Sequence, residues 1–524
     1  MIKFRFLSIV LCCNFFIRAH ESPKLTVIIV IDQFAYHELQ KLIPHMQGGI
    51  KFLFNNGINY TNAHQINGAT VTAAGHAAIA TGTLARDHGF VNNKWYTPEG
   101  KKINCDDDTA DQAAVFTQTG LYNFGKSAHN LMVDTLSDQL ILARDARYQV
   151  YALSLKSRAA IPMAGKLGKA LWFDHDTGSF TSSKAYFKEL PAWVKQFNQK
   201  NFLTKKSYTW QLAYNKNSRA YNFPFIHDYR FIEGHKSIIG VPLTYENFER
   251  TPQANQLLLD CALALINNTL KPNRHDHLVL WLSLSSLDKV GHQFGPHSME
   301  AIDMLYHMDK QLNQFIAAIY KKVPQEDVLF VLTSDHGVQP IPELTHGKRI
   351  YKNDIKNSIN KALFDKYGIE RSITQIKVPF VYINPAIQKT LDKQTKKELL
   401  YDIIKLFKNS PGIKDAWLSQ DLIKLTFDCN DPRNYLKNHF YPRRSGDIIF
   451  QVEPYTYLSS KKFGTGHSLP YAYNTHVPLI VYQAGMHKKV ITKRVTIPQL
   501  APTLARLLNV PAPQASTFNV LPGI

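Results

Sequence analysis

Apolar runs of strand length recur along this chain, and polar, reactive residues follow most of them. Near-continuous runs of Val, Ile and Leu are typical of strands buried on both faces, as in a parallel sheet covered by helices. The runs are Leu25 to Ile31 before Asp32, Tyr148 to Leu155 before Lys156, His277 to Leu287 before Asp288, Asp327 to Ser334 before Asp335, and Val477 to Tyr482 after a Gly/His loop.

Helical patterns lie between these runs. Thr251-Pro252 is typical of an N-cap followed by Pro at the first helical position, and Ser298 can cap a second helix that extends to Lys321-Lys322. The alternation of strands and helices predicts an α/β fold, a doubly wound and mainly parallel sheet with helices on both faces.

Two stretches interrupt the alternation. Residues from about 174 to 250 are rich in Tyr, Phe, Lys and Asn, which indicates loops and short elements. Residues from about 340 to 462 contain a strand pattern at Ile376 to Ile383, a helix pattern at Lys396 to Lys408 and a strand around Asp447 to Val452, which indicates a small α+β cap. A length of 524 residues alone suggests roughly three to four folding units. The pattern instead predicts one main domain over residues 20–524 that carries both stretches as insertions.

The first nineteen residues have the pattern of a signal peptide. Lys3 and Arg5 precede an apolar run, Phe6 to Ile17, that is shorter than the roughly 20 residues needed to span a bilayer. We expect cleavage near Ala19 and export, to the periplasm or the medium if the source is bacterial, with no transmembrane segment left. A retained membrane anchor is the alternative, because the cleavage sequence is mediocre.

The charge and the cysteines narrow the class of protein. The 61 Lys+Arg against 41 Asp+Glu give +20, and loss of three cations with residues 1–19 leaves 58 minus 41, or +17. Such a surplus attracts anions, whether nucleic acid, anionic lipid or a phosphorylated substrate. The remaining cysteines, Cys105, Cys261 and Cys429, allow at most one disulfide, so disulfides are not the framework of the fold.

Carboxylates and histidines follow several of the predicted strands. Ligands of an open α/β sheet bind beyond the carboxyl ends of its strands, so Asp32, Asp288 and Asp335 should share one crevice with Lys156. Carboxylates so close repel one another unless a cation compensates them. The nearby histidines are His292, His336 and His467. Three Asp and three His match the donors that a pair of Zn²⁺ or similar divalent ions requires. A loop ion pair or a helix cap explains any single Asp-His pair better than it explains the whole set.

A threonine-containing segment follows the first strand. Gly68-Ala-Thr70-Val-Thr72-Ala-Ala-Gly-His76 leads into a small-residue helical stretch, Ala73 to Thr81. A threonine at a helix N-terminus lies where the dipole and free N–H groups favour an anion, although a plain N-cap is its commonest role. The predicted metal ligands nearby raise a second possibility, a metal-held hydroxyl that acts as a nucleophile.

The ordered set of motifs resembles the alkaline phosphatase superfamily. It is closest to the threonine-nucleophile branch, which holds the type I phosphodiesterase/nucleotide pyrophosphatases and the phosphate-irrepressible bacterial alkaline phosphatases. The matching stretches are Val30-Ile-Asp32-Gln, Thr70-Val-Thr72-Ala-Ala-Gly-His76 through Thr81-Gly82, His88-Gly-Phe-Val-Asn-Asn93-Lys-Trp-Tyr96, Ser154-Leu-Lys156-Ser-Arg158, Asp288-Lys-Val-Gly-His292-Gln-Phe-Gly-Pro296, Thr333-Ser-Asp335-His336-Gly337 and Gly464-Thr-Gly-His467.

The resemblance implies two Zn²⁺ per chain and a threonine nucleophile. One metal would be held by Asp288, His292 and His467, and the other by Asp32, Asp335 and His336 with Thr72 bridging to it. Thr72 is the implied nucleophile because the family threonine lies four residues before the motif histidine, here His76.

The resemblance also implies the reaction. Thr72 would attack the phosphorus of a small phosphorylated substrate, and water would hydrolyse the phosphothreonine intermediate. Asn93 matches the family's phosphate-contacting asparagine. Lys156 and Arg158 point to the same side of an alternating segment and suit a dianionic monoester better than a diester. The same Lys-x-Arg marks the phosphate-irrepressible alkaline phosphatases.

Alternative functions remain open at this point. The first is a phosphodiesterase/nucleotide pyrophosphatase of the same superfamily, and the second is a catalytically dead protein that binds polyanions through its basic surface. A phosphomutase fits less well with export, and the chain lacks the C/S-x-P-x-R context that sulfatases need. No specific nucleic-acid binding is expected. The oligomeric state is open, with a monomer favoured.

Overall fold

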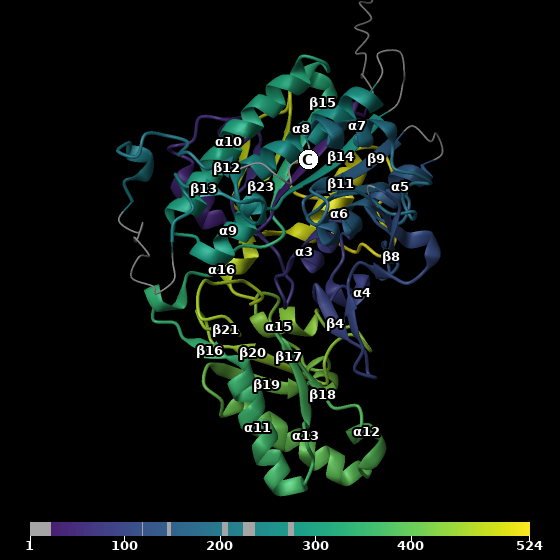
Figure 1. Ribbon diagram of the computed structural model, residues 1–524, viewed down its shortest axis with the longest axis vertical. Helices are drawn as coiled ribbons and strands as arrows, with labels where there is room; N and C mark the ends of the chain where they lie inside the picture. The colour runs from purple at the N-terminus through teal and green to yellow at the C-terminus, as the bar shows by residue number, and fades with distance from the viewer. Residues whose placement is uncertain (1–21, 118, 144–147, 202–207, 224–235, 271–276) are drawn as a thin grey trace, which may run out of the picture.

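The computed structural model describes residues 22–117, 119–143, 148–201, 208–223, 236–270 and 277–524 (Figure 1). The predicted signal peptide, residues 1–19, lies outside the described residues. No helix in the described part of the chain is long and apolar enough to cross a membrane.

A nine-stranded sheet forms the larger part of the molecule, in the order β11-β10-β9-β14-β1-β15-β23-β2-β24. The neighbours β10, β9, β14, β1 and β15 are all parallel, whereas β11 and β23 run against the strands beside them. The mainly parallel sheet predicted from the apolar runs is therefore confirmed. The strands are β1 (Leu25–Ile31), β2 (Ile58–Tyr60), β9 (Tyr148–Ser154), β10 (Lys169–Asp174), β11 (Ser179–Thr181), β14 (His277–Leu284), β15 (Val328–Thr333), β23 (Leu479–Gln483) and β24 (Lys489–Ile491).

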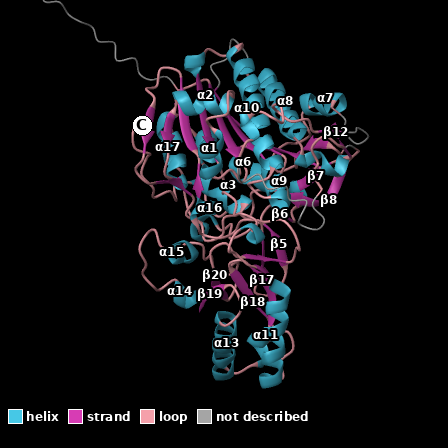
Figure 2. Ribbon diagram, turned by 90° about the vertical axis from the view of Figure 1, so that its left-hand side faces the viewer, coloured by secondary structure: helices cyan, strands magenta, loops and turns pink. Residues whose placement is uncertain are grey.

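Helices cover both faces of this sheet, as the side view in Figure 2 shows. Alternate residues of β1 enter different cores: Val27 and Ile29 pack with one set of helices, and Ile28 and Val30 pack with the other. On the first face lie α1 (Tyr36–Leu42), α2 (Gly49–Asn56), α8 (Pro252–Thr269), α9 (Ser286–Phe294) and α10 (Met299–Tyr320). On the second lie α3 (Thr72–Thr81), α5 (Leu136–Leu142), α6 (Ser157–Ala164) and α17 (Leu500–Leu507).

The helix starts predicted from capping signals agree with the structure. Pro252 is the first residue of α8, and the Ser298 hydroxyl accepts a hydrogen bond from the Ala301 N–H at 3.1 Å, where α10 begins. The end of one strand was predicted wrongly: β14 ends at Leu284, three residues before Leu287. Its neighbour β1 ends at the paired residue Ile31, so the backbone beyond Leu284 has no strand to bond and turns into α9.

Residues 349–459 contain a second sheet with its own hydrophobic core, which we call the small-sheet unit (green in Figure 1). The predicted single strand Ile376 to Ile383 is two strands of a hairpin, because Pro379 lies at the turn between them and has no N–H to donate. The sheet has the order β17-β18-β20-β19. Its elements are α11 (Lys352–Tyr367), β17 (Ile373–Lys377), β18 (Phe380–Ile383), α13 (Lys393–Lys408), β19 (Ile413–Leu418) and β20 (Ile448–Val452).

Where described, residues 174–250 form short elements beside α8 and α10. The Trp210 indole donates to Asp303 Oδ2 at 2.6 Å, which ties this segment to α10. The elements are α7 (Ala192–Lys200), β12 (Tyr208–Thr209), β13 (Pro242–Leu243) and two 3₁₀ turns. Cys105, Cys261 and Cys429 are all free thiols, so none of the three forms a disulfide.

Candidate active site

The carboxyl ends of four parallel strands bring the predicted site residues together. Asp32 directly follows β1, Lys156 lies just beyond β9, and Asp335 lies just beyond β15. Asp288 reaches the same place from the first turn of α9. The Lys156 ammonium lies between two carboxylates, 2.6 Å from Asp32 Oδ2 and 2.5 Å from Asp288 Oδ2. The predicted convergence of these side chains at the strand ends is therefore observed.

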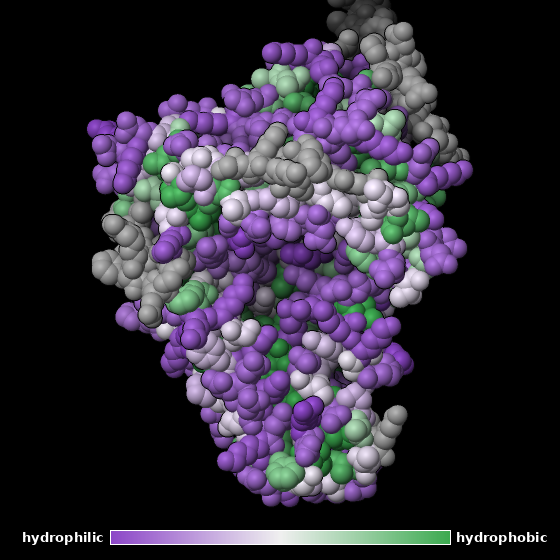
Figure 3. All heavy atoms as spheres, viewed as in Figure 1, coloured by the Kyte–Doolittle hydropathy of each residue, from purple (hydrophilic) through white to green (hydrophobic). Residues whose placement is uncertain are grey.

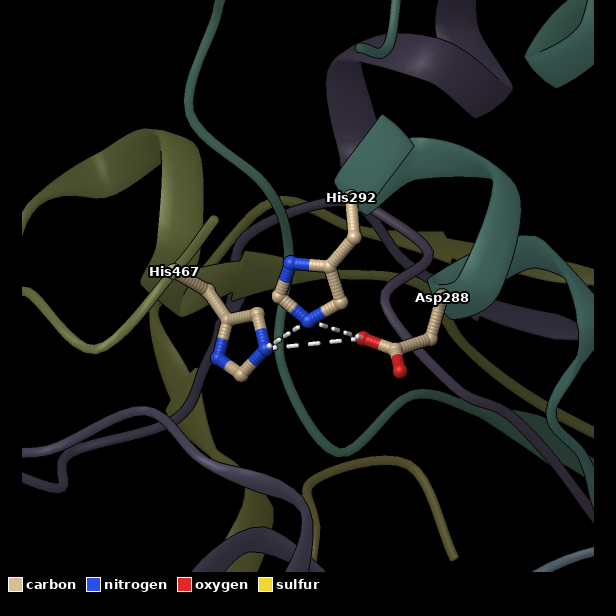
Figure 4. Close-up of side chains that lie close together, drawn as sticks. All are labelled: Asp288, His292 and His467. Atoms are coloured by element: carbon tan, nitrogen blue, oxygen red, sulfur yellow. Dashed lines mark hydrogen bonds and ion pairs between the residues drawn. The ribbon is translucent and has the colours of Figure 1, made fainter. Parts of the chain in front are cut away.

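Asp288, His292 and His467 form the first cluster of this crevice (Figure 4). The two imidazole Nε2 atoms are 3.1 Å apart, and they lie 3.2 Å (His292) and 3.4 Å (His467) from Asp288 Oδ1. The four-residue spacing of Asp288 and His292 places both side chains on one face of α9. Gly464 permits this packing, because a Cβ there would lie 2.1 Å from the His292 carbonyl oxygen.

Backbone carbonyls fix the orientation of three imidazoles. Nδ1 of His292 lies 3.0 Å from the Thr465 oxygen, that of His467 lies 2.6 Å from the Thr70 oxygen, and that of His336 lies 3.0 Å from the Gly337 oxygen. A carbonyl can only accept, so the neutral form of each ring would carry its proton on Nδ1 and present a lone pair on Nε2. Hydrogen bonds from Nδ1 to a carbonyl orient metal-binding histidines, and the close approach of two Nε2 lone pairs indicates a cation between them.

Asp32, Asp335 and His336 form the second cluster, directly beside the first. His336 Nε2 lies 3.3 Å from Asp335 Oδ2 and 3.7 Å from Asp32 Oδ1, and all three side chains are fully buried. Among the described residues, these same three atoms are buried and have no hydrogen-bond partner, although His76 Nδ1 lies within ion-pair distance of Asp335 Oδ2, at 3.3 Å. Buried polar atoms are rarely left unpaired, so three of them converging indicate a missing positive ligand. The donor set of carboxylates and imidazoles fits a divalent metal such as zinc.

The electrostatics of the crevice agree with this donor set. Burial raises the pKa of Asp32, and Asp335 raises it further. Burial acts on Asp288 in the same direction, but Lys156 and His292 outweigh it and hold the pKa of Asp288 well below its usual range. Burial and the adjacent His467 hold the pKa of His336 well below the usual value, so this imidazole is neutral. A neutral imidazole is the metal-binding form.

Thr72 is the first residue of α3 and is buried beside the second cluster. Gly75, three residues on, packs against the backbone of Asp335, where a Cβ would lie 2.3 Å from the carbonyl oxygen. The other candidate threonine, Thr70, is engaged elsewhere: its hydroxyl donates to the Leu469 oxygen at 3.2 Å and accepts from the Ser468 N–H at 3.1 Å. The Thr70 side chain therefore holds the loop after His467.

The remaining predicted phosphate contacts differ in their surroundings. Asn93 lies beside Thr72, because its Oδ1 accepts a hydrogen bond from the N–H of the next residue, Ala73, at 2.9 Å. The side-chain amide nitrogen of Asn93 is then the group that can donate to a phosphate. The alternating segment predicted for Lys156 and Arg158 is wrong, because β9 ends at Ser154 and α6 begins at Ser157, with Arg158 in its first turn. The buried Nε of Arg158 has no hydrogen-bond partner among the described residues. Lys156 instead contacts two predicted metal ligands, Asp32 and Asp288.

Gln33 is a site residue that sequence reasoning missed. Its backbone N–H donates to Asp335 Oδ1 at 3.1 Å and its Nε2 donates to Asp288 Oδ1 at 2.9 Å, so one residue supports both clusters. Gln33 has a φ of 74°, unusual for a residue with a side chain. Gly291 makes room for it, since a Cβ there would meet Gln33 Oε1. Its position directly after Asp32 was the signal in the sequence that could have assigned Gln33 to the site.

Comparison with known proteins gives separate information on the family and the fold. The family model of type I phosphodiesterase/nucleotide pyrophosphatase matches residues 26–479. The chain belongs to this family. An alkaline phosphatase, PhoV, of Synechococcus elongatus is 28% identical to the chain over 517 residues, covering 95% of the chain and 92% of the relative. PafA, an alkaline phosphatase of Elizabethkingia meningoseptica, is 30% identical over 522 residues, covering 94% and 93%.

The crystal structure of wild-type PafA superposes with a TM-score of 0.85 at 28% identity, covering 95% of the chain and 98% of that structure. These findings confirm the family resemblance drawn from the motifs and the alkaline-phosphatase-like fold. They also confirm the prediction that the chain is an enzyme of the alkaline phosphatase type.

Proposed function

We propose that this family member is an exported, metal-dependent phosphate monoester hydrolase, an alkaline phosphatase that works through a phosphothreonine on Thr72. The observation that carries the proposal is the convergence of unpartnered, buried ligand atoms of Asp32, Asp335 and His336 beside the N-terminus of α3. The names of the relatives PhoV and PafA support it.

Two zinc ions fit the two clusters. Asp288, His292 and His467 would hold one, and Asp32, Asp335, His336 and Thr72 would hold the other. When bound, such ions neutralise the phosphate oxygens and lower the pKa of a coordinated hydroxyl or water. With cations bound at Asp32 and Asp288, the Lys156 ammonium would no longer be needed to neutralise these carboxylates and could pair with the substrate phosphate.

The chain's own residues then carry out two displacements. Thr72 Oγ1 forms a bond to phosphorus as the bond to the leaving alcohol oxygen breaks, and the alcohol departs. Water next attacks the same phosphorus, which releases inorganic phosphate and returns the Thr72 hydroxyl. The free N–H groups at the start of α3 and the Asn93 amide can donate to the phosphate oxygens during both steps.

The charge of the substrate follows from Lys156 and Arg158. A monoester carries one more negative charge than a diester and no second substituent, so two extra cations favour the monoester.

The direct test compares kcat/KM for an aryl phosphate and a bis-aryl phosphate at alkaline pH. We expect faster monoester turnover in the wild type, and a larger loss of monoester than of diester hydrolysis in Lys156→Ala. Faster diester turnover would instead support a phosphodiesterase/pyrophosphatase, the function in the family's name.

Metal content tests the remaining alternative, a dead protein that binds polyanions. We expect about two zinc ions per folded chain, measured on the same preparation as the substrate panel. A chain that binds no zinc and hydrolyses neither ester would favour the polyanion-binding protein.

Export and the domain plan belong to the same proposal. Residues 1–19 would direct the chain out of the cytoplasm, and residues of about 174–250 and 340–462 would be insertions into one catalytic domain. N-terminal sequencing of the mature protein tests the first point, because cleavage near Ala19 predicts a chain that begins at about residue 20.

A further inference from the structure

Three lysines lie where the small-sheet unit meets the part of the molecule that contains the nine-stranded sheet: Lys94, Lys352 and Lys377. Figure 3 shows a hydrophilic, hollowed surface between these two parts of the molecule. The proposed mechanism uses none of the three, although each lies on a segment that is tied to a predicted site residue.

Lys94 directly follows Asn93 and starts β4 (Lys94–Tyr96). Trp95 is buried in the main core, so Lys94 and Tyr96 share the opposite face of this strand. The Tyr96 ring packs against Tyr382 of β18, with ring centroids 5.2 Å apart. Lys94 therefore lies on the side of β4 that faces the small-sheet unit.

Lys377 approaches the same place from the small-sheet unit. It is the last residue of β17, and Asn92 Nδ2 donates to the carbonyl oxygen of the next residue, Val378, at 3.0 Å. Ile376 is buried in the small core, so Lys377 lies on the opposite face of its strand, away from that core. The β17–β18 turn is thus held against the segment that carries Asn93.

Lys352 is the first residue of α11. It follows β16 (Arg349–Tyr351), and Arg349 donates to the Gly464 oxygen at 2.7 Å, in the loop that carries His467. A lysine in the first turn of a sixteen-residue helix adds to the positive end of the helix dipole, which is unfavourable without an anion.

The three lysines repel one another and lack acidic partners. In the part of the chain that the structure describes, none of the three forms an ion pair. Burial, together with the charges of Lys352, Lys94 and Arg158, lowers the pKa of Lys377 to about 8. Burial and Lys94 likewise lower the pKa of Lys352. Half-buried, uncompensated cations of this kind are costly unless an anion binds among them.

We infer that Lys94, Lys352 and Lys377 form a second anion subsite, which binds a further phosphate carried by the leaving group of the substrate. The inference rests on the proposed function, because the subsite is defined relative to the phosphate at Thr72. For a nucleoside diphosphate, Thr72 attacks the terminal phosphorus and the bond from this phosphorus to the bridging oxygen breaks. The nucleoside monophosphate leaves with that oxygen. The lysines then neutralise the charge of the leaving phosphate.

The test compares ADP, whose leaving group is a phosphate, with AMP, whose leaving group is a neutral nucleoside. In Lys377→Ala and Lys352→Ala we expect the ratio of kcat/KM for ADP over AMP to fall about tenfold, with the double variant lower still. Lys377→Arg keeps the charge and should restore the ratio. Lys361→Ala removes an exposed charge from the same helix α11 and should leave the ratio within about twofold of wild type.

Either of two results would overturn the subsite: an unchanged ADP/AMP ratio in the lysine variants, or an equal fall in Lys361→Ala. If the wild type hydrolyses neither AMP nor an aryl phosphate, the proposed function fails separately. Calorimetric binding of ADP and AMP to the zinc-loaded protein then still decides the subsite. The subsite requires that the wild type binds ADP more tightly than AMP and that Lys377→Ala binds ADP about tenfold more weakly than the wild type does. Equal binding of ADP by the wild type and Lys377→Ala would exclude the subsite.

Discussion

Lys156 illustrates how one side chain serves both the stability and the chemistry of the site. Its side chain is 3% exposed, and its ammonium contacts Asp32 and Asp288, which are also buried. Its position after a predicted strand placed Lys156 among Asp32, Asp288 and Asp335, and the Lys-x-Arg pattern added a contact with the substrate phosphate. Which carboxylates it meets depends on the order of β9, β14 and β1 in the sheet, and no local pattern reveals that order.

We predict that Lys156→Met destabilises the metal-free protein. Removal of one partner from a buried ion pair leaves the other charges uncompensated and costs about 3–5 kcal/mol, which urea denaturation after chelation would measure. Zinc should reduce this deficit. The exposed Lys195–Glu189 pair is the control, since Lys195→Met should cost less than about 1 kcal/mol. Similar losses in both variants would argue against the buried bridge.

Glu38 gives the stability a pH dependence that is independent of the metal clusters. Burial raises its pKa to about 8 from 4.5, although Glu38 Oε2 accepts a hydrogen bond from the Ala35 N–H at 3.0 Å. The folded pKa exceeds the unfolded one, so this group's stabilising contribution is complete below about 4.5 and is lost as the pH rises through about 8.

We therefore predict that Glu38→Gln makes the free energy of unfolding less dependent on pH between 5 and 9. Each unit of pKa difference corresponds to about 1.4 kcal/mol, so the gain at pH 9 is at most a few kcal/mol. Denaturation curves across this range measure it. Glu189→Gln, at an exposed carboxylate, should follow the wild type. A Glu38→Gln profile parallel to that of the wild type would contradict the prediction.

At the scale of elements, α3 can place Thr72 beside the proposed metal ligands only because this helix lies very close to the loop after β15. Gly75 permits this contact, since a Cβ would lie 2.3 Å from the backbone oxygen of Asp335. Alanine normally stabilises a helix by about 1 kcal/mol relative to glycine. Helix propensity therefore predicts that Gly75→Ala stabilises the protein, whereas the contact with Asp335 predicts that it destabilises the protein.

We predict that packing outweighs propensity in Gly75→Ala. The variant should lose about 1–3 kcal/mol of stability and at least about tenfold in kcat/KM for an aryl phosphate, as α3 moves away from Asp335. In Gly120→Ala, where no atom lies within 4 Å of the added Cβ, the change should stay within about 0.5 kcal/mol. A Gly75→Ala enzyme as stable and active as the wild type would show that the contact is not needed.

Element boundaries were harder to predict than the elements themselves. The apolar run at His277 continues to Leu287, but the strand ends where its neighbour β1 ends, which is a tertiary constraint. Pro379 did offer a local signal for the β17–β18 turn, because proline rarely lies inside a central strand. The helix starts at Thr251-Pro252 and Ser298 depend only on neighbouring residues and were predicted well, although only the Ser298 side chain makes a capping hydrogen bond.

At the scale of the whole molecule, the candidate ligands could be found from the sequence because strand ends of an α/β sheet converge. The grouping into two clusters came from the family resemblance, and contacts made by Gln33 required its positive φ and its long side chain in three dimensions. The length resolves into one large sheet and the small-sheet unit, with the candidate site beside the carboxyl ends of β1 and β15.

The central claim is that Thr72 becomes covalently phosphorylated during turnover. The most direct measurement is acid quenching of the zinc-loaded enzyme during hydrolysis of an aryl phosphate, followed by mass spectrometry of the peptides. The account predicts one phosphate on Thr72 in the wild type, and neither this phosphopeptide nor hydrolysis in Thr72→Ala. A phosphate on another residue, or undiminished hydrolysis by Thr72→Ala, would contradict it.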